Sequence, residues 1–303
     1  MDWILLQDVV NGLSAGLCYA LLAIGFTLIF GVLNAVNFAH GEIYMIGAFA
    51  GLMIALALAP PLIAVVLIVG AIGAALGIGL ERVAFRPLRR SRDEAALKSR
   101  ALRESTLLSS LAVGIIVREL AEIGFGGDMQ PIPDRLMIND PIPWGELVFA
   151  RGDFIIFGTA CAMLLALQLF LHRTSIGLGI RAVSNDLIGA LYCGVHADRV
   201  IVWTFAIGSS FGAMAGLLVG LYYGTIFPYM GFAPTLKAFV ATLMGGLTNI
   251  PGAVACALLI GLAESLSVEV MPSRWVGIVP YVMLLATLLF FPNGLFGRRV
   301  DRA

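Results

Sequence analysis

Four hydrogen-bonding side chains occur within the segment VLNAVNFAHGE (32–42), which lies between two long apolar runs. They are Asn34, Asn37, His40 and Glu42, and no Lys or Arg accompanies them. Neutral donors and acceptors beside one acid suit a small polar or zwitterionic solute, because a row of fixed charges would hold such a solute too tightly. The alternative is a tight turn, with Asn and Gly supplying the turn geometry and Glu42 serving as a first-turn acid. The sequence leaves both interpretations open.

No motif of covalent or metal chemistry accompanies these residues. The sequence contains no Walker A, HExxH or GxSxG motif, which are the patterns of nucleotide, zinc-protease and serine-hydrolase sites. Cys193 and His196 have CxxH spacing, but two candidate ligands are a weak zinc signal. A packed thiol beside a surface histidine is the favoured interpretation. We therefore expect a protein that is not an enzyme and that binds no metal or cofactor itself.

The elements that must position the polar residues are membrane spans. Of the 303 residues, 60% are hydrophobic and 13% are charged, and the mean hydropathy is +0.96, whereas a soluble domain has about 25% charged residues. Apolar runs of roughly 18 or more residues predict transmembrane helices, so we expect one all-α, polytopic membrane domain over residues 1–303. The net charge of zero gives no support to nucleic-acid binding. The runs cover about 11–33, 43–80 (divided at Pro60-Pro61), 104–125, 153–171, 200–223, 235–268 and 275–291.

The basic residues predict the orientation of the chain. Fourteen of the 19 Lys and Arg residues lie in the loop 82–103, the loop 172–199 and the C-terminus. Short loops rich in Lys and Arg lie in the cytoplasm, so the N-terminus is predicted outside and the C-terminus inside. The loops 126–152 and 224–234 are then external, and the loop 82–103 is expected to contact anionic lipid. The polar segment 32–42 would lie at the cytoplasmic end of the first span, at the inner mouth of a solute path.

The segment 235–252 is predicted to be a broken or re-entrant helix. Residues 235–248 number only 14 and reach about 21 Å as a helix, less than the hydrocarbon thickness of about 30 Å. The chain would then cross the membrane seven times with an added hairpin, or nine times. Half-helix ends can bind a substrate carboxylate through their N–H groups, and the alternative is a tight turn between two spans. The candidate path residues here are Gly245, Gly246, Thr248 and Asn249.

The loop 172–199 is predicted to contain a short helix. Residues 184–186 (Ser-Asn-Asp) are typical of a helix start, and Gly194 is a typical stop. Gly177 and Gly179 are expected to interrupt the chain before it. An apolar face outside the membrane is costly unless it meets a partner or lies on lipid. The side chains expected on that face are Leu187, Ile188, Leu191 and Tyr192.

Two acids and one basic residue lie near the predicted outer end of the fourth span. Arg118 and Glu122 are spaced i, i+4, with Glu119 between them. Residues at this spacing are neighbours on a helix, and long charged side chains reach the membrane interface. An ion pair between Arg118 and Glu122 is the favoured interpretation, and a substrate contact is the alternative.

Motifs in four parts of the chain occur together in one known family. They are NFAHGE (37–42), RA…N…A…GV (181–195), LMGGLTNIPG (243–252) and FPNGLFG (291–297). Together they resemble the permeases of branched-chain amino acid ABC importers, and among these the LivH-type subunit. The resemblance covers nearly the whole chain, and the combination is much more specific than any single motif.

The resemblance implies a permease subunit of an ATP-driven importer that moves branched-chain or similar small hydrophobic amino acids across the bacterial inner membrane. It implies a second, related permease subunit as partner in a heterodimer, two cytoplasmic ATPase subunits that hold ATP and Mg, and an extracytoplasmic substrate-binding protein. The loops 126–152 and 222–234 become candidate docking surfaces for that protein, although an aromatic belt also explains the second loop. The short helix would dock into the ATPase through Arg181, Ala182, Asn185, Asp186, Leu187, Ala190, Leu191, Gly194 and Val195.

Two other functions stay open at this point. Urea or short amides are alternative cargoes for the same importer class, because no side chain reports the size of the solute. A stand-alone secondary transporter or channel would need no ATPase. In that case the apolar face in the loop 172–199 would lie on lipid, whereas interfacial helices are usually longer and more basic.

Overall fold

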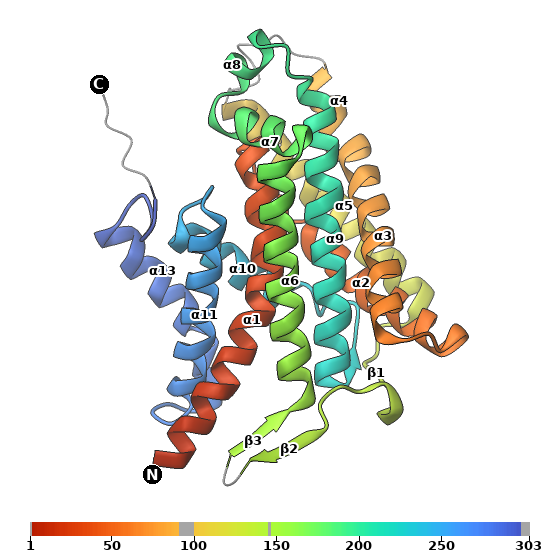
Figure 1. Cartoon of the computed structure of the whole chain (residues 1–303), viewed down its shortest axis with the longest axis vertical. Helices are drawn as coiled ribbons and strands as arrows, with labels where there is room; N and C mark the ends of the chain where they lie inside the picture. The colour runs from red at the N-terminus through yellow and green to blue at the C-terminus, as the bar shows by residue number, and fades with distance from the viewer. Residues whose placement is uncertain (1, 91–99, 145–146, 298–303) are drawn as a thin grey trace.

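The computed structural model describes residues 2–90, 100–144 and 147–297. They form a bundle of helices with two small β-sheets at one end (Figure 1). The expected lipid contacts of the basic loop fall partly outside the described residues, because Arg92 and Lys98 are not among them. The long helices are α1 (Asp2–Leu33), α2 (His40–Leu58), α3 (Leu62–Leu80), α5 (Arg100–Phe125), α6 (Arg151–Arg173), α9 (Ala197–Tyr223) and α11 (Ile250–Ser267).

Shorter elements connect and cover these helices. A π-helical turn (Glu81–Phe85) extends α3 and continues into the single turn α4, Arg86–Arg90. The other short helices are α7 (Ser175–Asn185), α8 (Leu187–Tyr192), α10 (Phe232–Gly245), α12 (Ser273–Val276) and α13 (Val279–Phe290).

The prediction of an all-α, polytopic membrane protein is confirmed. Within the described residues, seven helical segments are long and apolar enough to cross a membrane. Two further helices complete the bundle: α5, which carries several charges, and α10, which has only 14 residues. Helix α1 begins at the end of the bundle that carries the strands, and α7 and α8 lie at the opposite end (Figure 1).

Small residues bring the helices of the bundle into close contact. Helix α1 packs against α9, α10 and α11, and its contact with α11 is backbone to backbone: a Cβ on Gly261 would lie 2.3 Å from the Gly16 nitrogen. A Cβ on Gly216 of α9 would lie 1.8 Å from the Tyr44 carbonyl oxygen of α2. Such small-residue contacts hold helices together in membranes, where lipid tails are as apolar as the helix surfaces.

Two helices begin inside the bundle rather than at its ends. After Leu33 the chain turns back, so the His40 ring at the start of α2 lies beside Gly25; a Cβ there would lie 3.0 Å from the ring. After α9 the chain folds back again, and a Cβ on Gly231 would lie 1.9 Å from the Gly41 oxygen. The N-termini of α2 and α10 therefore meet within the bundle. The polar segment begins at the end of α1, and its last residues fold back beside Gly25 of that helix.

Short strands close the end of the bundle where α1 begins. The stretch 126–152, predicted to be irregular, contains a hairpin in which β2 (Pro141–Trp144) pairs antiparallel with β3 (Leu147–Ala150). Strand β1 (Gln130–Pro131) pairs with β4 (Thr225–Ile226), which follows α9. This second pairing fixes the chain at the point where it turns back toward Gly231.

Candidate functional site

The meeting of α2 and α10 places two helix N-termini side by side. The N-cap residues are Ala39 for α2 and Gly231 for α10, and no described side chain caps either helix. Uncapped N–H groups and the helix dipole make such an end a binding place for negative charge. Glu42 in the first turn of α2 supplies one such charge from the protein itself. Thr235 of α10 uses its hydroxyl to donate to the Gly231 oxygen at 2.6 Å.

A group of charged and aromatic side chains surrounds this point, and we call Glu42, Arg118, Glu122 and Tyr229 the α5 cluster. Arg118 Nη1 lies 3.8 Å from Glu42 Oε1, and the guanidinium lies 5.2 Å from the centre of the Tyr229 ring. The Tyr229 hydroxyl donates to Glu122 Oε2 at 2.9 Å, and this bond raises the pKa of Tyr229. Arg118 thus pairs with Glu42 on another helix, rather than with Glu122 as the i, i+4 spacing suggested. Tertiary packing decided the partner.

Glu42 of the α5 cluster lies in the first turn of α2, a helix long and apolar enough to cross a membrane. Helix α2 continues from Glu42 to Leu58, a length of up to about 24 Å at about 1.5 Å per residue, and Phe125 of α5 stacks on Phe49 along the way. Glu119, next to Arg118, is exposed. A charge at the bilayer centre costs about 2.5–3.5 kcal/mol on insertion scales, and charged side chains in spans face a bundle interior or a water-filled cavity. This face of α5 therefore does not suit contact with lipid.

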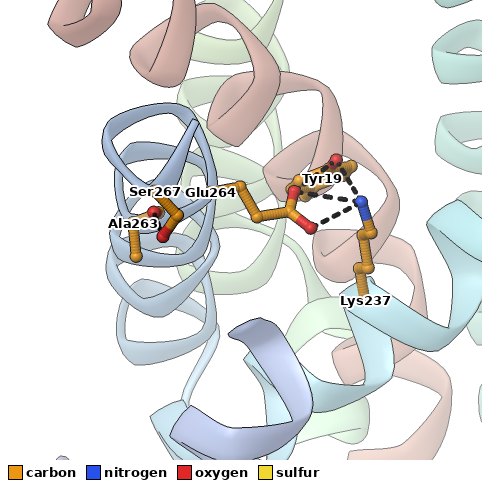
Figure 2. Close-up of polar contacts among 5 residues, drawn as sticks. All are labelled: Tyr19, Lys237, Ala263, Glu264 and Ser267. Carbon is orange, nitrogen blue, oxygen red and sulfur yellow. Dashed lines mark hydrogen bonds and ion pairs between the residues drawn. The ribbon is translucent and has the colours of Figure 1, made fainter. Parts of the chain in front are cut away.

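A second charged group includes Lys237 of α10 (Figure 2), and we call Tyr19, Lys237 and Glu264 the α10 cluster. Lys237 Nζ lies 2.7 Å from Glu264 Oε1 and donates to Glu264 Oε2 at 3.0 Å. It also donates to the Tyr19 oxygen at 2.8 Å, and the Tyr19 hydroxyl donates to Glu264 Oε2 at 2.8 Å. The three side chains form a closed triangle that joins α1, α10 and α11.

The α10 cluster was not predicted from the sequence. The signal was present, because two opposite charges interrupt the apolar run 235–268, and ionisable residues inside a span are expected to find a partner there. The two charges in this run indicate that an ion pair exists. Only the packing of α1 shows that Tyr19 is the third member of the cluster.

The four polar residues of the segment 32–42 have different surroundings. Asn34 is exposed and takes a left-handed backbone conformation with φ 53°. Asn37 and His40 are buried, and the described residues offer no hydrogen-bond partner to either polar atom of either side chain. Glu42 belongs to the α5 cluster. The polar atoms of Asn37 and His40 thus lie beside the two helix N-termini without a hydrogen-bond partner among the described residues. Each unsatisfied buried group is expected to cost about 1–3 kcal/mol of folding stability.

The segment containing Gly245, Gly246, Thr248 and Asn249 forms a turn at the end of the bundle. Gly246 has φ 95°, which a side-chain-bearing residue rarely adopts. Asn249 caps α11 by accepting from the Gly252 nitrogen at 3.1 Å, and it donates to the Phe296 oxygen at 3.0 Å. These contacts describe a tight turn, and a role of its residues in the substrate path stays a prediction. Helix α10 is short as predicted, but its uncapped, re-entrant end is its N-terminus rather than this turn.

Helices α7 and α8 project from the same end of the bundle (Figure 1). As predicted, Asp186 caps α8 by accepting from the Ile188 nitrogen at 3.2 Å, and the chain reverses at Gly194, with φ 81°. Contrary to prediction, Gly177 and Gly179 do not interrupt the chain but lie within α7. Gly177 allows α7 to pack closely against α6, because a Cβ at this position would lie 2.3 Å from the Phe170 oxygen of α6.

The predicted ATPase-docking residues are divided between the two helices. Arg181, Ala182 and Asn185 lie in α7, and Leu187, Ala190 and Leu191 lie in α8, with Gly194 and Val195 in the turn that follows. The predicted apolar face is only partly exposed, because Leu187 packs against the core and Ile188 and Leu191 are half-buried. The strongly exposed apolar side chains here are Tyr192 of α8, at 80%, and Leu178 of α7, at 60%.

Comparison with known proteins gives a consistent result. Residues 9–288 match the family described as "Branched-chain amino acid transport system / permease component". The chain is 35% identical to the high-affinity branched-chain amino acid transport system permease protein LivH of Escherichia coli K12, over 97% of this chain and 96% of that protein. It is 34% identical to BraD of Pseudomonas aeruginosa over the same shares, and 28% identical to a probable LivH of Methanocaldococcus jannaschii over 91% and 88%. No solved structure matches the chain.

Proposed function

Because the chain belongs to the branched-chain amino acid transport system permease family, we propose that it is the translocating subunit of an ATP-driven importer of branched-chain amino acids. The observation that carries the proposal is the 35% identity, over 97% of the chain, to a permease named for that cargo. Seven apolar spans supply the membrane body that such a subunit needs. A bacterial inner membrane is the corresponding location, with the end that bears α7 and α8 in the cytoplasm.

The partners follow from the same assignment. Two ATPase subunits would dock against α7 and α8, whose exposed Tyr192 and Leu178 offer apolar contacts. A related permease chain would complete the membrane domain. A substrate-binding protein would deliver cargo to the opposite end, where a pocket of about 580 Å³ lies between the start of α1 and the β2–β3 hairpin. ATP and Mg would be held by the ATPase subunits and not by this chain.

The packing supports a mechanical route from the ATPase to the polar centre. Helix α7 contacts α6 and α9 closely, since a Cβ on Gly179 would lie 3.0 Å from the Val200 side chain. Helix α9 in turn contacts α2 at Gly216 and Tyr44, one turn beyond the uncapped N-terminus. Rigid helices with such contacts move as units and shift against one another in discrete steps. A pull on α7 and α8 would therefore reach the start of α2, where cargo passes.

Reconstitution tests the proposal. Proteoliposomes with the permease pair, both ATPase subunits and loaded binding protein should accumulate L-leucine only when ATP is present at the ATPase side. Asn185→Arg and Gly194→Trp should abolish uptake by disturbing α7 and α8, and Gly158→Ala in α6, where a Cβ meets open space, should leave it intact. Uptake that persists without ATPase subunits would overturn the proposal in favour of a stand-alone transporter. Transport of urea but not leucine would assign the alternative cargo.

A further inference from the structure

We propose that the α5 cluster is the place where the permease recognises the charged head group of its cargo, with Arg118 binding the α-carboxylate and Glu42 binding the α-ammonium of a zwitterionic amino acid. This inference rests on the proposed function and deepens it. It assigns a binding site inside the membrane to residues of α2 and α5.

The first argument is the open geometry of the Arg118–Glu42 pair. A well-formed guanidinium–carboxylate bond is about 2.7–2.9 Å long, whereas Arg118 Nη1 and Glu42 Oε1 are 3.8 Å apart. The Arg118 Nε atom is buried, and the described residues give it no hydrogen-bond partner. The Tyr229 ring meanwhile supports the guanidinium from one side. Arg118 is thus held in place while donors of its planar fork, which suits a carboxylate, stay free.

The second argument is the balance of charge around the cluster. Glu42, Glu119 and Glu122 outnumber the single basic residue, Arg118. The uncapped N-termini of α2 and α10 add partial positive charge close to Glu42. A carboxylate entering alone would meet an excess of acids, and a cation entering alone would leave the buried Arg118 Nε atom without a partner. A zwitterion presents both charges at once, and each finds its complement.

The third argument is access. The Arg118 side chain is 20% exposed, Tyr229 is 47% exposed and Glu119 is also exposed. Because charged side chains at this depth avoid lipid, the exposed face of α5 is expected to line a path between this chain and its permease partner. In the α10 cluster the Lys237 side chain is equally exposed, at 20%, but it already donates to Glu264 and to Tyr19.

The test measures L-leucine delivered for each ATP hydrolysed by the complete importer in proteoliposomes with saturating loaded binding protein. Arg118→Gln should lower this ratio by about ten-fold or more, the loss expected for a charged hydrogen-bonding group, while ATP hydrolysis and the thermal midpoint of the complex change little. Arg118→Lys should recover part of the ratio, because it keeps the charge but not the fork. Arg274→Gln, at an exposed arginine of α12, is the matched control and should change nothing.

The outcomes separate the inference from the proposed function. A ratio unchanged in Arg118→Gln and in Glu42→Gln would overturn the inference, while leucine import by the unaltered importer would still support the proposed function. Uptake and ATP hydrolysis falling in equal proportion, with no recovery in Arg118→Lys, would also overturn it, because that pattern indicates a structural role. Failure of the unaltered importer to carry leucine would overturn the proposed function, and the inference with it.

Discussion

The α5 cluster and the α10 cluster contain similar groups in the same bundle, yet they are built differently. In each cluster a basic residue pairs with a glutamate and lies at about cation–π distance from a tyrosine ring. In the α10 cluster Lys237 lies 2.7 Å from Glu264, whereas in the α5 cluster Arg118 lies 3.8 Å from Glu42. The closed arrangement satisfies its members and fixes α10 to α1 and α11. The open arrangement leaves donors available at the start of α2, so burial of charge alone does not indicate a binding site.

The largest expected loss of stability comes from removing the lysine of the α10 cluster. Lys237→Met would leave Glu264 buried without its cation, which typically costs about 3–5 kcal/mol of stability. The thermal midpoint of the importer in detergent should fall accordingly. Because a well-packed apolar pair often replaces a buried ion pair without loss, Lys237→Met combined with Glu264→Leu should restore most of the midpoint. A single variant as stable as the unaltered protein would show that the triangle does not hold α10.

A smaller effect is expected at the contact between the starts of α2 and α10. Gly231→Ala would place a Cβ 1.9 Å from the Gly41 oxygen and force the starts of α2 and α10 apart, at the cost of about 1–3 kcal/mol typical of overpacking. Leucine uptake should fall further than stability does, because both uncapped N-termini shift away from the α5 cluster. Uptake and thermal midpoint measured side by side, with Gly158→Ala as control, check this. Normal uptake would show that the meeting of the two helices is not needed for transport.

The smallest effect on stability is expected from removing the cation of the open cluster. Arg118→Met should lower stability by only about 1 kcal/mol, because the ion pair is long, at 3.8 Å, and because the dipole of α2 stabilises Glu42 in its first turn. The thermal midpoint should therefore stay much closer to that of the unaltered protein than the midpoint of Lys237→Met does. Equal losses in the two variants would remove the distinction between the clusters.

Much of the architecture could be predicted because it depends on local pattern. Long apolar runs predicted the spans, and the Pro60-Pro61 division falls between α2 and α3. Asp186 and Gly194 predicted the ends of α8, since capping requires only neighbouring residues. The short length of α10 followed from counting residues against membrane thickness. The loop 126–152 was less well predicted, because Pro-rich stretches gave no sign of the β2–β3 pairing.

The sequence by itself determined that this protein lies in a membrane, roughly where its helices begin and end, and which polar residues interrupt its apolar runs. Only the tertiary structure decided which of these residues meet: Glu42 with Arg118, Lys237 with Glu264 and Tyr19, and the start of α2 with the start of α10. The reason is physical. Hydropathy and capping act over a few neighbouring residues, whereas the partner of a buried charge is set by the fold-back of the chain after α1 and α9, and that fold-back depends on glycine contacts between helices far apart in the sequence.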